Sequence, residues 1–313
     1  MPATKKKATK KTVKKAVKKV AKKPVKKTAK KSSANFGPAV TAQRMFNLAA
    51  LSETVSGPGV AASLPQHVLA RGKKAFIVTD QGVRGAGIVA PIVENLEKAG
   101  VPTLVFDQVS PNPTDVNVAA GVAALNRFGV EGTVVVFIGG GSVMDCGKYI
   151  ALAAPNGVDN LHLAFAPNLD ANDRIDFGTL APRAQASKPG LPTIALPTTS
   201  GTASETNGGG LITDTLTNPK VHRKLTFSNP SVAPAVVLLD PTLTLGMPAR
   251  GTAACGMDVL THAIECYTSA GSNPYADALA LHAIRLTGQW LPKVVINGAD
   301  VEAREQMQIA SHL

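Results

Sequence analysis

The sequence lacks the features that would place it among secreted or membrane-spanning proteins. Its three cysteines, Cys146, Cys255 and Cys266, form no CxxC pair and are too few for a disulfide framework. The longest apolar runs, such as 133–138, are far shorter than the roughly 20 residues that a transmembrane helix needs. The N-terminus has no apolar signal core, and its lack of arginine argues against a mitochondrial presequence. A reducing, cytoplasmic location is therefore expected.

Acidic residues are also missing from residues 1–31, which hold 15 lysines. The net charge of +12 belongs to this segment, because the rest of the chain carries 18 basic and 21 acidic residues. Residues 1–35 have little apolar surface to bury and are expected to be a disordered tail. Three interpretations of the tail stay open: a solvated segment, binding to nucleic acid or another polyanion by counterion release, or attachment to an anionic membrane surface.

From residue 36 onward, strand and helix patterns alternate. Strands are expected at 75–78, 103–106, 132–138, 193–196 and 236–239, and helices at 87–99, 114–128 and 142–154. This order predicts an α/β domain over 36–247, with a doubly wound parallel sheet covered by helices on both faces. Residues 155–190 are rich in Pro, Asn and Asp and are expected to form loops. Beyond Pro248 the apolar spacing is helical, which indicates the start of an all-helical domain over 248–313.

A run of glycines follows the clearest strand. Gly139, Gly140 and Gly141 lead into Ser142 and a helix, and such a turn lets a phosphate approach the free N–H groups of the helix N-terminus. Ser142 and Asp145 also fit a capping box. The alternative is a tight turn with a good cap, and the usual GxGxxG fingerprint of dinucleotide-binding proteins is absent.

Two more candidate segments follow strands. Residues 197–205 (PTTSGTASE) concentrate hydroxyl and small side chains, which can surround a phosphate or a nicotinamide amide, although an ordinary turn would use the same residues. Asp80 stands at a strand end, where a carboxylate can accept hydrogen bonds from a ribose diol. The plainer interpretation of Asp80 is a turn residue.

Asp258 and His262 stand four residues apart in a segment that is predicted to be a buried helix. Positions i and i+4 share one helix face, so the two side chains can converge. An oxygen and a nitrogen ligand make half of a divalent-metal site. No obvious second half follows before Leu313.

Taken in order, these motifs resemble the iron-containing (group III) alcohol dehydrogenases. The resemblance covers about residues 55–313 and rests on 78–80 (VTD), 111–114 (PNPT), 139–148 (GGGSVMDCGK), 197–205, 239–241 (LDP) and 256–267 (GMDVLTHAIECY). It implies a dinucleotide-binding domain followed by a helical metal-binding domain. It also implies an enzyme, expected to be a homo-oligomer, that uses NAD to interconvert small primary alcohols and aldehydes.

The resemblance assigns roles to individual residues. Asp80 would lie by the adenosine ribose and favour NAD over NADP, and the turn from Gly139 to Asp145, with Ser142, would hold the pyrophosphate near Asn112. The remaining cofactor contacts would be Thr198, Thr199, Thr202 and Lys224.

Asp258 and His262 would be the first two ligands of a catalytic Fe²⁺ or, as an alternative, Zn²⁺. A metal there would lower the pKa of the alcohol, and the nicotinamide would accept the hydride. The family completes its metal site with two histidines further along, and this sequence ends before them. The expectation is therefore a truncated metal domain with exposed apolar helical surface. The alternative to an active enzyme is a relative that binds the cofactor without turnover.

Overall fold

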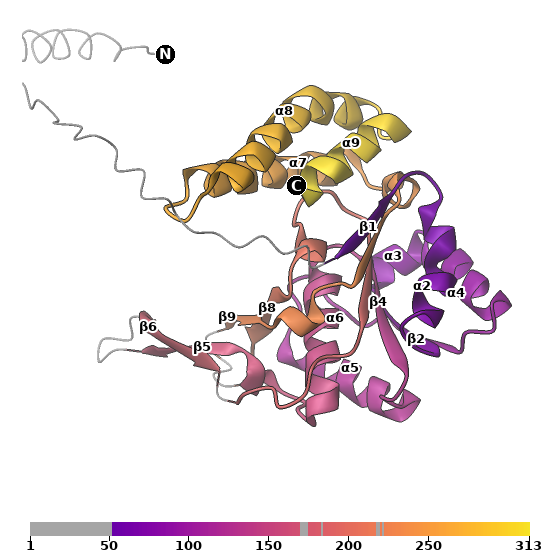
Figure 1. Ribbon diagram of the computed structural model, residues 1–313, viewed down its shortest axis with the longest axis vertical. Helices are drawn as coiled ribbons and strands as arrows, with labels where there is room; N and C mark the ends of the chain where they lie inside the picture. Colours follow the sequence, from indigo (N-terminus) through magenta and orange to yellow (C-terminus); the bar gives the residue numbers. More distant parts are fainter. Residues whose placement is uncertain (1–51, 170–174, 183, 217–219, 221) are drawn as a thin grey trace, which may run out of the picture. The chain divides into compact units, whose positions relative to one another are not determined.

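A computed structural model describes residues 52–169, 175–182, 184–216, 220 and 222–313 (Figure 1). The predictions for the tail at 1–35 lie outside these residues. The strands are β1 (Glu53–Ser56), β2 (Lys74–Val78), β3 (Thr103–Phe106), β4 (Thr133–Gly139), β5 (Phe165–Leu169), β6 (Ile175–Pro182), β7 (Thr193–Pro197), β8 (Gly209–Asp214), β9 (Arg223–Ser228) and β10 (Val236–Leu239). The α-helices are α2 (Leu64–Leu69), α3 (Gln81–Gly85), α4 (Val89–Lys98), α5 (Asp115–Phe128), α6 (Gly141–Ala153), α7 (Ala249–Thr268), α8 (Pro274–Ile296) and α9 (Val301–His312).

A six-stranded parallel sheet forms the centre, with the order β1-β10-β7-β4-β2-β3. The chain adds β3 on one side of β2 and β4 on the other, so the winding direction reverses between β2 and β4. All residues of β4 are buried, as expected for an apolar strand covered on both faces. The predicted doubly wound α/β fold is confirmed.

Successive side chains of each strand point to opposite faces of the sheet, so the core is divided between the two faces. Phe76 and Val78 of β2 pack in a cluster with α5 and α6, whereas Ala75 and Ile77 pack in a second cluster with α2 and α4. Figure 1 shows these two helix pairs on opposite sides of the sheet. The helix predicted at 87–99 is α4, and a separate short helix, α3, precedes it, with Gly87 at φ 79° between the two.

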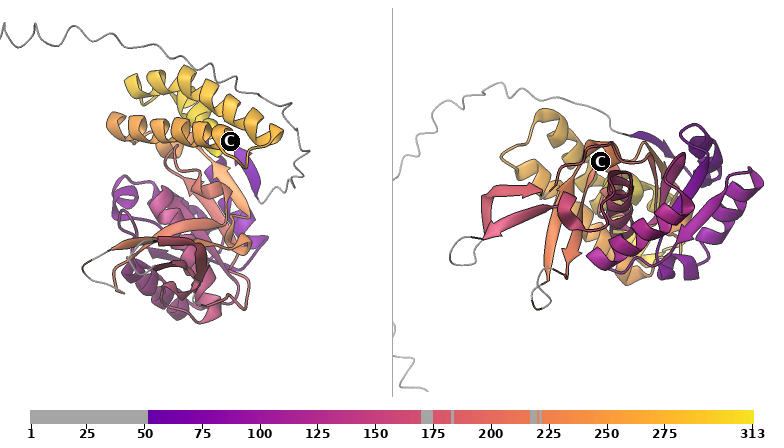
Figure 2. Two further views of the ribbon diagram at one scale, coloured as in Figure 1. Left: turned by 90° about the vertical axis from the view of Figure 1, so that its left-hand side faces the viewer. Right: turned by 90° about the horizontal axis from the view of Figure 1, so that it is seen from below.

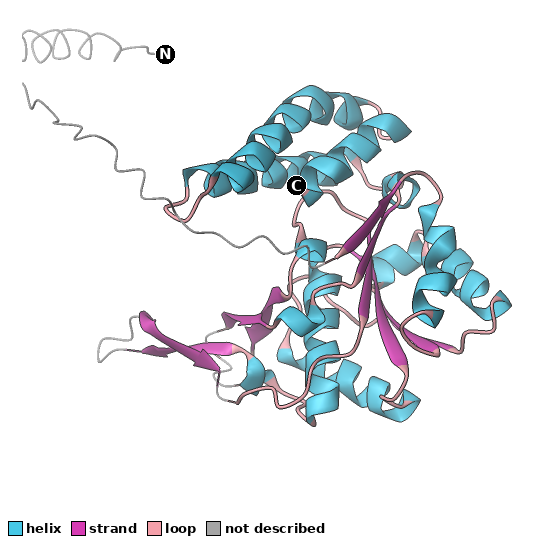
Figure 3. Ribbon diagram, viewed as in Figure 1, coloured by secondary structure: helices cyan, strands magenta, loops and turns pink. Residues whose placement is uncertain are grey.

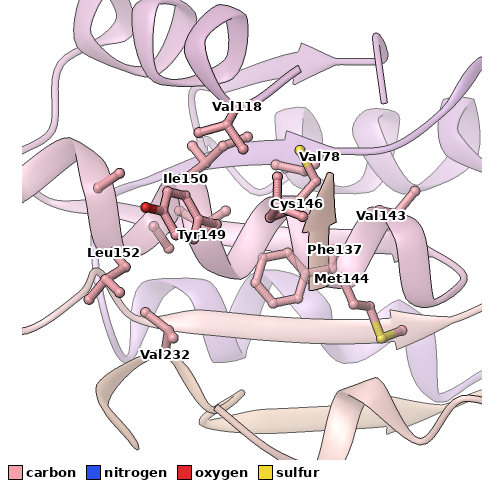
Figure 4. Close-up of a cluster of buried hydrophobic side chains, with 14 of the residues drawn as sticks. Val78, Val118, Phe137, Val143, Met144, Cys146, Tyr149, Ile150, Leu152 and Val232 are labelled. Atoms are coloured by element: carbon pink, nitrogen blue, oxygen red, sulfur yellow. The ribbon is translucent and has the colours of Figure 1, made fainter. Parts of the chain in front are cut away.

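Helix α6 is the most deeply buried helix of the α/β part, since all but three of its residues are buried. Its apolar side chains, among them Met144, Tyr149 and Ile150, pack beside Phe137 of β4 in the close-up of Figure 4. The approach to β4 is close because position 147 is a glycine. A Cβ atom there would lie 2.4 Å from the Phe137 ring.

Gly147→Ala is therefore expected to lower the free energy of unfolding by about 1–3 kcal/mol, the usual cost of overpacking a core. Gly288→Ala is the matched control, because Gly288 lies in α8 with no atom within 4 Å of the added Cβ. The control should gain about 0.5–1 kcal/mol from the lower chain entropy of alanine. Denaturant titration of both variants measures the difference, and equal shifts would contradict the close packing at position 147.

A second sheet corrects the prediction that 155–190 is loop. β5 and β6 pair antiparallel and join β9 and β8 in the order β6-β5-β9-β8 (Figure 3). Local composition did not reveal this hairpin, which joins the rest of the sheet through a distant partner: Phe165 pairs with Thr226. The sheet brings β8 and β9 beside α6, whose residues contact β8.

Helices α7, α8 and α9 follow the sheets and pack on one another (orange to yellow in Figure 2). Asn273 begins α8 by accepting hydrogen bonds from two backbone N–H groups, and Asp300 begins α9 in the same way with one. Gln308 of α9 donates to the backbone oxygens of Pro197 and Asp240, which joins this layer to the parallel sheet. Among the described residues no helix is long and apolar enough to cross a membrane.

Helix α7 is less buried than the sequence predicts. Met257, Ile264 and Tyr267 are 52%, 46% and 46% exposed. Val259 and Ala263 on the opposite face are buried. Among the described helices, α8 and α9 pack against α7, and they cover only that face.

Candidate functional site

The predicted cofactor residues meet at the carboxyl ends of three neighbouring strands. Gly139 at the end of β4 is paired with Pro197 of β7, and the N–H of Thr198 donates to the Gly139 oxygen at 3.0 Å. On the other side, Thr79 after β2 donates to the Ile138 oxygen at 2.8 Å, which places Asp80 beside the glycine turn. This edge is where the winding direction reverses, and ligands of open α/β sheets bind at such points.

The glycine turn and the threonine loop are in direct contact. A Cβ at position 140 would lie 3.0 Å from the Thr199 methyl group, and one at position 141 would lie 2.7 Å from that of Thr202. Glycine is thus needed for packing as well as for an approaching phosphate. Helix α6 begins at Gly141 and has no side-chain cap, which leaves its first-turn N–H groups available to an anion.

The predicted capping box of Ser142 and Asp145 is wrong. The helix begins one residue earlier than predicted, with Gly140 as its N-cap. The Ser142 hydroxyl instead accepts from the Asn112 N–H at 3.2 Å. The Asp145 carboxylate accepts from the Ser204 hydroxyl at 2.5 Å and from the Leu211 N–H at 2.9 Å.

Asn112 links Lys224 to the helix N-terminus. It has a left-handed φ of 53°, and its side-chain oxygen accepts from the Lys224 ammonium at 2.8 Å. Lys224 belongs to β9, so the second sheet delivers a positive charge to the same edge as the first turn of α6. Positive charge and free N–H groups together suit a phosphate.

One cavity of about 850 Å³ collects most of the predicted residues. Its walls include Asn112, Gly141, Ser142, Asp145, Thr202, Lys224, Asp258 and His262. Gly139, Gly140, Thr198 and Thr199 stand outside the lining and contact one another at the strand ends. Asp80 stands outside the lining, where it caps α3 by accepting from the Val83 N–H at 2.9 Å.

Asp258 and His262 converge on α7 as the spacing predicts. Their Oδ1 and Nε2 atoms are 3.7 Å apart, and both side chains are nearly half exposed. At that separation both atoms can reach one ion at the usual bond lengths of about 2.0–2.2 Å. The Gly201 carbonyl lies 3.3 Å from Nδ1, and because a carbonyl only accepts, this contact favours the neutral tautomer with the proton on Nδ1, which carries a lone pair on Nε2.

These two side chains fit half of a divalent-metal site. In the part of the chain that the structure describes, no cluster of three or more His, Cys, Asp or Glu residues is placed to hold a metal ion. Any further ligands to such an ion would be water, substrate or groups other than these.

Sequence reasoning missed most of one wall of the cavity, residues 204–211, of which only 204 and 205 fall within the candidate segment 197–205. It begins as a short 3-10 turn at Ser204–Thr206 and runs through Gly208 and Gly209 into β8. The signal was the run TNGGG after the threonine loop, which is unusually rich in glycine. Also missed was Lys148, a buried lysine beneath this wall.

Comparison with known proteins agrees with this geometry. Residues 52–241 match the family model "Iron-containing alcohol dehydrogenase", and residues 252–313 match the model of the C-terminal part of the same family. The chain is 37% identical over 273 residues to the 1,3-propanediol dehydrogenase of Citrobacter freundii, covering 86% of this chain and 65% of that protein.

Two further likenesses extend the comparison. The NAD-dependent methanol dehydrogenase of Bacillus methanolicus is 36% identical over 241 residues, which is 77% of this chain and 57% of the relative. A crystal structure of a 1,3-propanediol oxidoreductase superposes with a TM-score of 0.74 at 37% identity, covering 86% of this chain and 65% of the other. The chain thus spans less than two thirds of the length of these relatives.

Proposed function

Because the chain belongs to the iron-containing alcohol dehydrogenase family, we propose that it serves NAD-dependent, metal-dependent interconversion of small primary alcohols and aldehydes. One observation carries this proposal: a single cavity joins the N-terminus of α6 to the pair Asp258 and His262. The names of the relatives, which act on 1,3-propanediol and methanol, support a small alcohol as the substrate.

The cofactor would lie across the ends of β2, β4 and β7. The first-turn N–H groups of α6 and the Lys224 ammonium would bind the pyrophosphate, with Asn112 holding that ammonium in place. The Asp80 carboxylate would accept hydrogen bonds from the ribose hydroxyls of NAD and repel the additional phosphate of NADP. The hydroxyl groups of Thr198, Thr199 and Thr202 would surround the nicotinamide.

Asp258 and His262 would hold Fe²⁺ or Zn²⁺ on one helix face. Such an ion, when bound, polarises an alcohol oxygen and lowers its pKa, while the nicotinamide takes the hydride from the alcohol carbon. The work of the chain is to orient these groups. Gly201 favours one imidazole tautomer, and α7 sets the separation of the two ligand atoms.

The proposal is tested by incubating the full chain with Fe²⁺ or Zn²⁺, NAD⁺ and a panel of short alcohols while the absorbance of NADH is followed. We expect NADH formation that a chelator abolishes and metal restores, together with tighter binding of NADH than of NADPH. Binding of NADH without turnover would instead support a cofactor-binding relative that is not an active dehydrogenase. Absence of any dinucleotide binding would contradict both.

A further inference from the structure

Lys148 is a fully buried cation that the mechanism above leaves without a role. Its side chain leaves α6 with 0% exposure. The ammonium donates to the backbone oxygen and hydroxyl of Ser204 at 2.9 and 2.8 Å, to two oxygens of Asn207 at 3.4 and 3.3 Å, and to the Gly209 oxygen. Five oxygens around a group with three N–H donors make a cage like those that bind small cations.

Burying the Lys148 ammonium costs solvation free energy, which the surrounding oxygen atoms must offset. Burial, offset in part by the nearby carboxylates of Asp145 and Glu205, lowers the pKa of Lys148 to about 8. Asp145 lies 3.6 Å from the ammonium. An uncompensated buried ammonium would not persist.

Asp145, one turn before Lys148 on α6, contacts the same segment. Its carboxylate accepts from the Ser204 hydroxyl and from the Leu211 N–H, which are the two ends of the cavity wall at 204–211. The wall also passes directly over this carboxylate: a Cβ at Gly210 would lie 2.8 Å from the Asp145 carboxyl carbon. One lysine and one aspartate on adjacent turns of α6 therefore anchor the whole segment.

One end of the wall is also held by β9, since residues 209–211 pair with residues 226–228, whereas residues 204–207 precede this pairing. Three consecutive glycines, at 208–210, give its backbone a large entropy when it is free. It starts next to Ala203, which has a left-handed φ of 51° although it is not a glycine. Both features favour anchors from outside the segment, and Lys148 supplies one in addition to the pairing with β9.

We propose that Lys148 is a positioning residue whose ammonium holds the 204–211 wall in the shape that admits the nicotinamide end of the dinucleotide. This inference rests on the proposed function. It requires no contact between Lys148 and any ligand, since the side chain is enclosed behind the wall.

The test compares NADH binding to the full chain carrying Lys148→Met, Lys148→Arg or Lys148→Ala with that to the unaltered chain. Losing the charged hydrogen bonds should weaken NADH binding by about 10- to 100-fold in Lys148→Met, with partial recovery in Lys148→Arg. Hydrogen exchange should rise in the peptide that contains 204–211, because the backbone oxygens of Ser204, Asn207 and Gly209 lose the ammonium that anchors them. Lys98→Met makes the same change on an exposed lysine and should alter neither measurement.

Rescue by small cations is a second measurement, and it distinguishes the loss of the Lys148 ammonium from a general destabilisation of the fold. In Lys148→Ala, ammonium or methylammonium chloride should restore NADH binding, whereas tetramethylammonium chloride at equal ionic strength should not, because it has no N–H donors. Equal effects of the two kinds of salt, or unchanged NADH affinity and exchange in Lys148→Met, would overturn the inference. Failure of the unaltered chain to bind NADH would count against the proposed function instead.

Discussion

His262→Ala is expected to lower the affinity for Fe²⁺ or Zn²⁺ by more than about 100-fold and to abolish metal-dependent NADH formation. Removing a group that merely orients a ligand costs about 10- to 100-fold in metal affinity, so removing the ligand itself should cost more. The free energy of unfolding should change little, since the side chain is 48% exposed and its bond to the Gly201 oxygen is long at 3.3 Å. Titration of the metal-free chain with Zn²⁺ measures the affinity directly.

His282→Ala is the matched control for this experiment. His282 lies exposed on the neighbouring helix α8, with Arg285 as its partner, and its removal should leave metal affinity unchanged. Asp258→Asn is a second test variant. It keeps the shape of the Asp258 side chain and removes the negative charge that attracts the metal ion. Metal binding that survives both His262→Ala and Asp258→Asn would show that the ion binds elsewhere.

Much of the site follows from local sequence, because its parts depend on near neighbours. The strand before Gly139, the glycine turn and the helix after it form one continuous signal. The pair Asp258 and His262 needs only helical periodicity to converge. The parallel sheet then brings separate strand ends to one edge, as strand–helix alternation predicts.

The rest depends on contacts between residues far apart in the chain. Asp145 and Ser204 are 59 residues apart, and β5 joins the second sheet through Phe165, which pairs with the distant Thr226 of β9. No local sequence pattern shows that oxygen atoms from residues so far along the chain will surround Lys148. The capping box failed for the same reason, since its Asp145 carboxylate is engaged by Ser204 and Leu211 rather than by its own helix.

Gly141→Ala is expected to weaken NADH binding by about 10- to 100-fold or more, through two effects that can be separated. The added Cβ would lie 2.7 Å from the Thr202 methyl group, which forces the glycine turn and the threonine loop apart at a cost of about 1–3 kcal/mol. The same Cβ would cover the first N–H groups of α6, where the pyrophosphate is proposed to bind. Gly246→Ala, with no atom within 4 Å of its Cβ, is the control.

Adding Thr202→Ala to Gly141→Ala distinguishes these effects. The double variant removes the two nearest atoms, the Thr202 methyl at 2.7 Å and hydroxyl at 2.9 Å, and leaves its Cβ at 3.0 Å, so the free energy of unfolding should return part of the way toward that of the unaltered chain. NADH affinity should stay low, because the Cβ still obstructs the phosphate. Recovery of both quantities, measured against Thr202→Ala alone, would mean that Gly141 is required only for packing and that the pyrophosphate binds elsewhere. Persistent weak binding in a refolded, stable double variant would locate the phosphate at the N-terminus of α6, the position on which the proposed cofactor orientation depends.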